Sequence, residues 1–260
     1  MSMTESVQDK RPAQPPSFFA LGYDGLSEEF CVADQLYRRK KVFKHDFFAA
    51  TGLYSDASGQ LVVLKLQRTF PLFGFPMQWL GARIARHEVA IFRQLQGIRG
   101  IPKFIGIYGL TGYVHEFIPG EDLSPEMHPG EAFFANLAQL FTDLHARHVA
   151  YVDTNKRENI LFGADGRPYL IDFQISFWLR QGRDDSYLAQ WIFKRLVHED
   201  WYHFYKHKTR LAPQCCSAED FARAENRSWY IRLHRLIFRP LIQLRRKFLA
   251  QFKKSPTELR

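Results

Sequence analysis

The stretch HARHVAYVDTNKRENILFGADGRPYLIDFQ, residues 145–174, contains the end of a predicted helix, a loop with several charged side chains and a short β-hairpin. Asp153, Lys156 and Asn159 belong to the loop, and Asp172 follows the second strand of the hairpin. An Asp-Gly pair between the two strands is typical of a tight hairpin turn. The stretch fits either a floor that holds a metal ion and a phosphorylated ligand, or an ordinary helix, loop and hairpin with carboxylates at its ends.

The composition is that of a folded chain without a disulfide framework. It has 260 residues, of which 46% are hydrophobic and 24% charged, enough for one large domain or for two lobes that share a cleft. Only three cysteines occur and two are adjacent, which favours a reducing compartment and a cytoplasmic location. No run approaches the roughly 18 apolar residues of a membrane span. Residues 1–17 are polar and proline-rich and are predicted to form a disordered tail.

The order of strand and helix signals predicts an α+β fold with two lobes. The run LVVLKL is long and β-branched enough for a buried strand, and apolar residues recur at helical spacing through GEAFFANLAQLFTDLHARH. Strands followed by helices place a small β-rich N-lobe with one major helix at 18–117 and a mostly helical C-lobe at 118–226. The predicted elements are three strands within 37–68, a helix at 80–97, strands at 101–109 and 111–117, a helix at 130–148, the hairpin at 159–173 and helices from about 184.

Lys65 lies inside the apolar run and needs an anionic partner if it is buried. An unpaired ammonium group among apolar side chains is costly, so the expected partner is a carboxylate, a phosphate or both. The alternative is an edge-strand lysine that points to solvent. Glu88 lies in the next helix, flanked by its apolar positions, and can reach Lys65 if that helix packs on the sheet. Taken alone, Glu88 is equally compatible with a solvated helix position.

The ordered set of features resembles the protein-kinase-like superfamily. Residues 144–153 match the family's L-H-x-x-G-I-x-H-R-D sequence at four positions, which are Leu144, His145, Val149 and Asp153. Asn159 precedes a strand as the family's metal-binding Asn does, and Asp172 with Phe173 stands where the family's D-F-G begins. The resemblance covers the chain from about residue 36 to about residue 200, and it implies a kinase-like two-lobed fold.

The resemblance also implies catalytic and metal-binding roles. Asp153 would accept or orient the hydroxyl proton of the acceptor, and Lys156 would neutralise the phosphoryl group in transfer. Asn159 and Asp172 would bind Mg²⁺ through oxygen ligands. The loop from Asp153 to Asn159 is one residue longer than in the family, and the extra residue is expected among residues 154–157.

A nucleotide site follows from the same resemblance. Lys65 and Glu88 would hold the phosphates of ATP, and the adenine would lie against the backbone of residues 116–120, with Glu116 and Phe117 at its start. Catalysis would then depend on positioning and on charge stabilisation.

The sequence departs from the family pattern at several places. The segment VFKHDFF, residues 42–48, stands where a glycine-rich loop is usual and contains no glycine, so Lys44 or His45 is expected to contact phosphates instead. Tyr-Val replaces the usual His-Arg before Asp153, which removes the usual receiver for a phosphorylated activation loop. Gln174 replaces the Gly of D-F-G.

The acceptor is expected to be something other than a peptide. A short segment without A-P-E follows Gln174, so the usual peptide platform is absent, as in the RIO-type kinases and the bacterial kinases of lipopolysaccharide core sugars. We therefore expect a small-molecule or glycolipid acceptor, such as a lipopolysaccharide-type sugar or a lipid-linked substrate. A serine/threonine protein kinase with a protein acceptor is one alternative. A pseudokinase that senses nucleotide or binds a membrane is another.

The net charge of +9 lies in one C-terminal segment. Nine of the 36 Lys and Arg residues fall in 227–254, which has no Asp or Glu, so 27 basic residues balance 27 acidic ones elsewhere. Residues 227–260 are predicted to form basic amphipathic helices. With the aromatic and arginine-containing segment 70–86, they could hold the protein peripherally on an anionic membrane surface. Nucleic acid ranks second as a partner, and helices with solvated basic faces are the structural alternative.

Overall fold

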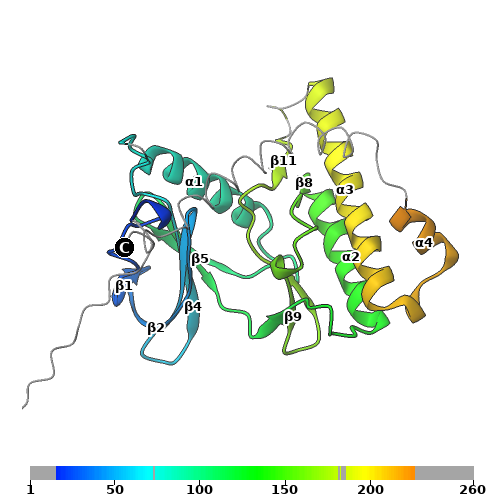
Figure 1. The fold of residues 1–260 in the computed structure, drawn as a ribbon, viewed down its shortest axis with the longest axis horizontal. Helices are drawn as coiled ribbons and strands as arrows, with labels where there is room; N and C mark the ends of the chain where they lie inside the picture. The colour runs from blue at the N-terminus through cyan, green and yellow to red at the C-terminus, as the bar shows by residue number, and fades with distance from the viewer. Residues whose placement is uncertain (1–15, 73, 181, 183–185, 226–260) are drawn as a thin grey trace, which may run out of the picture.

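The computed structural model describes residues 16–72, 74–180, 182 and 186–225. The predicted helices at 227–260 and most of the predicted tail lie outside these residues. The N-terminal part is a six-stranded antiparallel sheet in the order β1-β2-β3-β4-β6-β5, crossed by one long helix (Figure 1). Its elements are η1 (Pro16–Phe18), β1 (Glu29–Val32), β2 (Gln35–His45), β3 (Ala49–Ser55), β4 (Leu61–Gln67), α1 (Gln78–Gln94), β5 (Phe104–Tyr108) and β6 (Gly112–Glu116).

The sheet contains the predicted strands and one that was not predicted. Strand β1 is joined to β2 by a tight turn at Ala33 and Asp34, which adopt φ values of 52° and 59°. Such turns usually carry glycine or asparagine. Because neither is present here, the sequence lacks the usual hairpin signal at this point.

Strand β4 is buried on both faces, which explains its continuous apolar run. Val62 and Leu64 pack into a core with Phe30, Tyr54 and other residues on one side of the sheet. Successive side chains of a strand point to opposite faces, so the odd-numbered positions of β4, including Lys65, share the other face. Helix α1 also contacts β4. The strand therefore presents Lys65 in a largely buried position.

The C-terminal part is built on two long helices that run side by side, α2 and α3 (Figure 1). The predicted hairpin is present as β9 and β10, and β7 joins it as a third strand. No described helix has both the length and the apolar character needed to cross a bilayer. The elements are β7 (Gly120–Asp122), α2 (Glu131–Ala146), β8 (Val149–Ala150), η2 (Arg157–Asn159), β9 (Ile160–Gly163), β10 (Pro168–Leu170), β11 (Phe177–Trp178), α3 (Tyr187–Leu211), η3 (Pro213–Cys215) and α4 (Ala218–Glu225).

One hydrophobic core connects the two parts of the molecule. It contains Phe92 from α1, Phe141 from α2, Phe204 from α3 and Phe173 from the segment after β10. The rings of Phe92 and Phe173 meet edge to face, with 5.1 Å between their centroids. This contact fixes α1 relative to the C-terminal part, and therefore positions the residues that α1 contributes to the site.

Gly81 allows α1 to pack closely on the end of β4, and we predict that Gly81→Ala destabilises the fold. A Cβ atom at this position would lie 2.2 Å from the backbone oxygen of Arg68, so the helix would have to shift. Alanine normally favours a helix over glycine, but this clash should dominate and cost about 1–3 kcal/mol of unfolding free energy. Urea denaturation measures the change.

Gly130→Ala is the matched control, because nothing lies within 4 Å of a Cβ atom there. Its cost should stay within about 1 kcal/mol, the loss of a favourable N-cap residue. Equal losses in the two variants would contradict close packing at Gly81.

Candidate functional site

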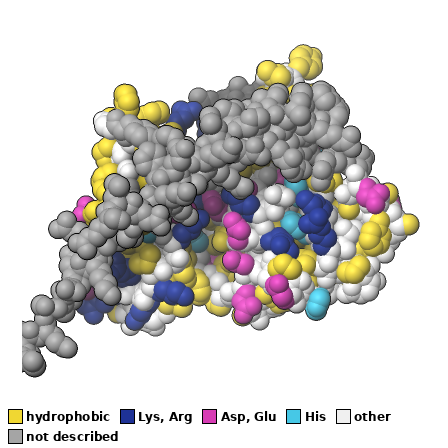
Figure 2. Space-filling model, viewed as in Figure 1, with side chains coloured by type: hydrophobic (Ala, Val, Ile, Leu, Met, Phe, Trp, Pro, Cys, Tyr) yellow, Lys and Arg dark blue, Asp and Glu magenta, His cyan; other side chains and the backbone are white. Residues whose placement is uncertain are grey.

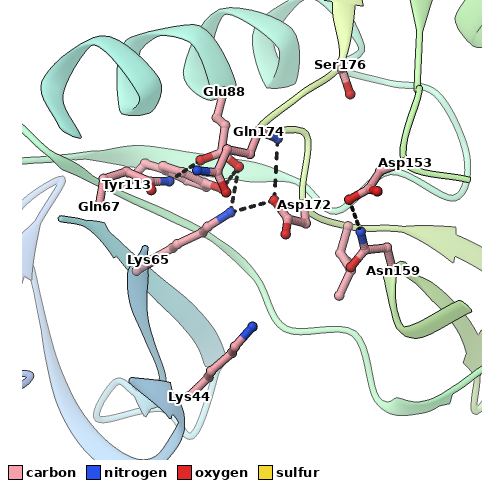
Figure 3. Close-up of polar contacts among 12 residues, drawn as sticks. Lys44, Lys65, Gln67, Glu88, Tyr113, Asp153, Asn159, Asp172, Gln174 and Ser176 are labelled. Carbon is pink, nitrogen blue, oxygen red and sulfur yellow. Dashed lines mark hydrogen bonds and ion pairs between the residues drawn. The ribbon is translucent and has the colours of Figure 1, made fainter. Parts of the chain in front are cut away.

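Lys65 joins two carboxylates that come from opposite parts of the molecule. Its Nζ lies 2.7 Å from Oε1 of Glu88 on α1 and 2.8 Å from Oδ1 of Asp172, which follows β10 (Figure 3). The residue is only 7% exposed, which excludes the solvent-facing alternative. The predicted contact between Lys65 and Glu88 is present.

Glu88 is fully buried and its carboxylate accepts further hydrogen bonds. The Tyr113 hydroxyl donates to Oε1 at 2.9 Å, and Gln67 Nε2 donates to Oε2. Tyr113 pairs with Lys65 across β4 and β6, and Gln67 lies two residues after Lys65 on the same face of β4. The sequence analysis did not select either residue. Strand alternation was the available signal for Gln67, whereas the position of Tyr113 depends on the register of β6.

The charged groups in this cluster shift one another's pKa values. Burial lowers the pKa of Lys65, but Glu88 and Asp172 more than compensate, so the net pKa lies above its ordinary value. Burial raises the pKa of Asp172, but the ammonium group of Lys65 outweighs it and the net pKa is lowered. Lys65 is therefore charged, and Asp172 is ionised at neutral pH. On the face seen in Figure 2, acidic side chains gather across the middle of the molecule with basic ones to either side.

Asp153, Lys156 and Asn159 form a second cluster beside the first. Lys156 Nζ donates to Oδ2 of Asp153 at 2.7 Å, and Asn159 Nδ2 donates to the same oxygen at 2.8 Å. Figure 3 places Asp172 between Lys65 and this cluster. Burial raises the pKa of Asp153, and the contacts with Lys156 and Asn159 only partly offset this effect. Two tight turns form the loop in which the extra residue was predicted. In these turns the Lys156 N–H donates to Asp153 O and the Asn159 N–H donates to Lys156 O.

Asp200 of α3 holds the loop that carries Asp153. Its buried carboxylate accepts from the backbone N–H groups of Tyr151 and Val152 at 2.7 and 2.8 Å, and from the Thr154 hydroxyl at 2.7 Å. His145 Nε2 lies 3.0 Å from the same carboxylate. Val152 adopts a φ of 71°, a left-handed conformation that is unfavourable for a β-branched residue and needs this support. Sequence reasoning missed Asp200, because its helix gives no sign that this face is buried.

His207 supports the same loop from two helical turns further along α3. Its Nε2–H donates to the Thr154 carbonyl at 2.7 Å, and burial lowers the pKa of the ring to about 4. His207 is therefore neutral in the folded protein at neutral pH.

Tyr151 connects the loop to the segment that carries Asp172. Its hydroxyl donates to the carbonyls of Ile171 and Asn159, the second at 3.2 Å. Its ring meets Phe173 edge to face with 5.4 Å between centroids. Tyr151 therefore connects the two clusters from a buried position. Asp172 itself has a φ of 62°, and the residue that follows it, Phe173, is fully buried.

The glycine-free turn between β2 and β3 is fixed by its own side chains. Asp46 Oδ1 accepts from the N–H groups of Phe48 and Ala49 at 2.8 and 3.1 Å. Arg68 donates to the Phe47 carbonyl at 2.9 Å, and its guanidinium group lies 4.2 Å from the Phe47 ring centroid. Since no residue of this turn has a positive φ, the turn needs no glycine. The amide groups of Asp46, Phe48 and Ala49 are thus occupied, unlike those of a loop that wraps phosphates.

Either Lys44 or His45 was expected to contact phosphates, and the two side chains differ in their surroundings. Lys44 lies below Lys65 in Figure 3, is largely exposed, and pairs with Asp46 at 2.8 Å. His45 Nε2 instead accepts a hydrogen bond from the Leu21 N–H at 3.2 Å, and burial lowers the pKa of the ring. The Nε2 atom of His45 is therefore engaged by the backbone, and Lys44 is the one of the two whose side chain is largely exposed.

The segment expected to face adenine has one amide without a partner. The N–H groups of Glu116 and Phe117 donate to Lys103 O and Leu61 O, and His115 Nδ1 lies 2.8 Å from Glu116 O. Within the described residues, the Ile118 N–H makes no hydrogen bond. Phe117 stacks on Phe43 of β2, with 6.0 Å between ring centroids. The sequence analysis selected Glu116 and Phe117 and did not select Ile118.

The oxygen atoms beside Asp172 fit a magnesium ion. Asp172 Oδ2 and Asn159 Oδ1 make no hydrogen bond with any described residue, while the other polar atoms of both side chains are engaged. Mg²⁺ prefers such oxygen ligands and takes its remaining ligands from water and substrate phosphates. The described residues contain no group of three or more His, Cys, Asp or Glu placed to hold a metal ion. Any metal held here would therefore need ligands from the nucleotide or from water.

No family model and no curated protein matches the chain. Two solved structures of the Rio2 kinase from Chaetomium thermophilum resemble it. The first is 17% identical with a TM-score of 0.49, and covers 67% of this chain and 58% of that chain. The second, an ADP/Mg²⁺-phosphoaspartate complex, is 18% identical with a TM-score of 0.48, and covers 71% and 61%. This chain thus spans about three fifths of the length of each. The α+β order is as predicted, with a β-rich N-terminal sheet and one major helix before a helical C-terminal part.

We predict that His207 makes stability sensitive to mild acid. Its folded pKa of about 4 lies below the ordinary value of 6.5, so its contribution is present above pH 6.5 and is lost as the pH falls toward 4. Between pH 7 and 5 this loss should amount to about 2 kcal/mol. His207→Gln keeps an N–H donor for the Thr154 carbonyl but does not titrate. Its free energy of unfolding should therefore fall correspondingly less between pH 7 and 5.

Urea denaturation of both proteins at the two pH values measures the difference. His115, whose pKa burial also lowers to about 4, is unchanged in both proteins and cancels in the comparison. Parallel pH dependence in the two proteins would exclude His207 as a source of acid sensitivity.

Proposed function

We propose that the protein is an ATP- and Mg²⁺-dependent phosphotransferase that acts on a hydroxyl acceptor. The observation that carries this proposal is the position of Lys65 between Glu88 and Asp172, beside the paired Asp153 and Asn159. A buried cation, a carboxylate with a free oxygen and a second carboxylate next to an amide are the groups needed to hold a metal-bound triphosphate and orient an acceptor.

Each group has a specific task in this proposal. Lys65 binds nucleotide phosphates and is held in place by Glu88. The raised pKa of Asp153 makes it a better acceptor for the proton of the attacking hydroxyl group. Asn159 and Asp172 supply oxygen ligands for Mg²⁺, which neutralises charge on the phosphates when it is bound.

The adenine and phosphate contacts are assigned from the remaining free groups. The Ile118 N–H donates to the adenine, next to Phe117, and Lys44 supplies a second phosphate contact. Lys156, already paired with Asp153, is placed to balance charge on the phosphoryl group in transfer.

A non-peptide acceptor is the favoured substrate class, such as a lipopolysaccharide-type sugar or a lipid-linked molecule. The segment after Asp172 is short, and β11 pairs at once with β8, next to the loop that carries Asp153. This arrangement supports a small acceptor more than a peptide on a long platform. A Ser/Thr protein acceptor is the alternative. Docking on an anionic membrane through 70–86 and 227–254 belongs to the same proposal.

A pseudokinase is a second candidate, and the glycine-free turn favours it. Asp46 occupies the amide groups of Phe48 and Ala49, which leaves them unavailable to nucleotide phosphates. The retained Lys65, Asp153, Asn159 and Asp172 favour the enzyme instead. The two candidates differ in metal-dependent nucleotide binding and in turnover.

We predict that ATP with Mg²⁺ stabilises the protein more than ATP alone. At saturating ligand the rise in Tm should be on the order of 5 °C, as expected from about 2–3 kcal/mol of binding linkage. Asp172→Asn removes the metal ligand charge and should abolish the Mg²⁺-dependent part. Asp165→Asn, on the exposed hairpin turn, serves as a control that should respond like the unmodified chain. A shift that is the same with and without Mg²⁺ would contradict the metal site.

We also predict that Asp153→Ala reduces phosphate transfer by about a hundredfold or more, since the general base is lost. ATP binding should persist, because Lys65, Glu88 and Asp172 are unchanged. Radiolabelled transfer to glycolipid, protein and small-sugar acceptors measures activity, and Asp143→Ala on the outer face of α2 is the control. Undiminished turnover in Asp153→Ala would remove Asp153 from the mechanism.

A further inference from the structure

A basic hollow lies next to the proposed site, between α1 and the segment that follows Asp172. Its volume is about 570 Å³, and its lining includes Arg83, Arg86 and His87 of α1 and Arg180. No Asp or Glu is among its described lining residues. The hollow therefore concentrates positive charge beside the proposed site.

Arg83 and Arg86 provide charge that is not used within the described part of the chain. Both are exposed, and neither forms an ion pair with a described residue. Among the residues that the structure describes, the only hydrogen bond of the Arg86 side chain is its Nε–H donated to the Ala82 carbonyl at 3.1 Å in the same helix. Guanidinium groups with unused N–H donors match the oxygen atoms of a phosphate group.

Hydrogen bonds connect the floor of the hollow with α1, which carries Glu88, and with the loop that carries Asp153. His87 precedes Glu88 in α1, and its Nε2 lies 2.8 Å from the Ser176 carbonyl. The Ser176 hydroxyl donates to the Tyr151 carbonyl at 3.0 Å, two residues before Asp153. Figure 3 shows Gln174 and Ser176 on the segment that leaves Asp172 beside α1. A molecule bound in the hollow would thus lie next to the loop of Asp153.

The rim of the hollow is apolar as well as basic. Trp79, Arg83 and Arg86 have the spacing of residues on one face of a helix, and Trp79 is 64% exposed. Ile175 lines the hollow and is 53% exposed. Phe70, at the start of the aromatic and arginine-containing segment 70–86, instead packs at Gly22, and residue 73 lies outside the described residues. The exposed apolar groups beside the two arginines suit an amphiphilic molecule with a phosphate group.

We propose that this hollow binds a phosphate monoester of the acceptor, with Arg83 and Arg86 as its main ligands. The binding itself is independent of the proposed function, and only the assignment to the acceptor depends on it. The shared chemistry is the phosphate monoester, which either a lipid or a soluble sugar can supply.

Calorimetric titration of the full chain without ATP tests the site directly. The probes are monomeric dihexanoyl phosphatidic acid and glucose 6-phosphate. We expect at least one probe to bind. In Arg83→Gln/Arg86→Gln the binding affinity should fall at least tenfold, as expected when about one hydrogen bond to a charged group or more is removed. Arg83→Lys/Arg86→Lys keeps the charge without the planar fork and should lose less.

Arg99→Gln/Lys103→Gln is the control, because it removes two exposed charges beyond the other end of α1 and should leave binding unchanged. Binding of the lipid probe alone identifies a lipid source, and binding of the sugar probe supports a soluble one. Failure of both probes to bind, or an equal loss in the control, overturns the proposal. Because no probe requires turnover, an inactive Asp153→Ala chain should bind as the unmodified chain does, which separates this proposal from the proposed function.

Discussion

The structure depends on one buried ammonium group placed between two carboxylates. Lys65 contacts Glu88 from the N-terminal part and Asp172 from the C-terminal part. Glu88 is fully buried, and without the cation its charge beside the half-buried Asp172 would be unpaired, which costs several kcal/mol. The same contacts therefore fix α1, β4 and the segment after β10 relative to one another. A nucleotide phosphate that binds here joins a charge network that already exists in the folded protein.

The turn between β2 and β3 shows how that network can act without a glycine-rich loop. The Asp46 carboxylate and the Arg68 guanidinium group fix the turn and occupy the amide groups of Phe48 and Ala49 and one carbonyl. In the proposed function, fixed charge from Lys65 and Lys44 takes the place of phosphate binding by these backbone amides. Such a turn encloses a ligand less completely, and it also pays less entropy to become ordered on binding.

The sequence was sufficient to predict features that depend on a local sequence pattern or on the free-energy cost of burying a charged group. The contact of Lys65 with Glu88 could be predicted because burying either group alone is unfavourable, and the hairpin of β9 and β10 because Asp-Gly marks its turn. The turn at Ala33 carries no such residue, so β1 was missed. Asp200 and Tyr113 could not be found, because their burial depends on helix packing and strand register. The sequence named Lys44 or His45 as a phosphate contact without separating them, because it gives no indication of which way each side chain points.

Asp200 explains how the loop that carries Asp153 is held in place. Four donors converge on its carboxylate, including the backbone of Val152 in a strained conformation. His207 and Tyr151 add contacts from the helix side and from the Asp172 side of the same loop. In kinases that carry the arginine, a phosphorylated segment can stabilise the loop from outside. Here buried groups stabilise it from inside, so the loop reaches its position when the chain folds and no modification is needed for the contacts described.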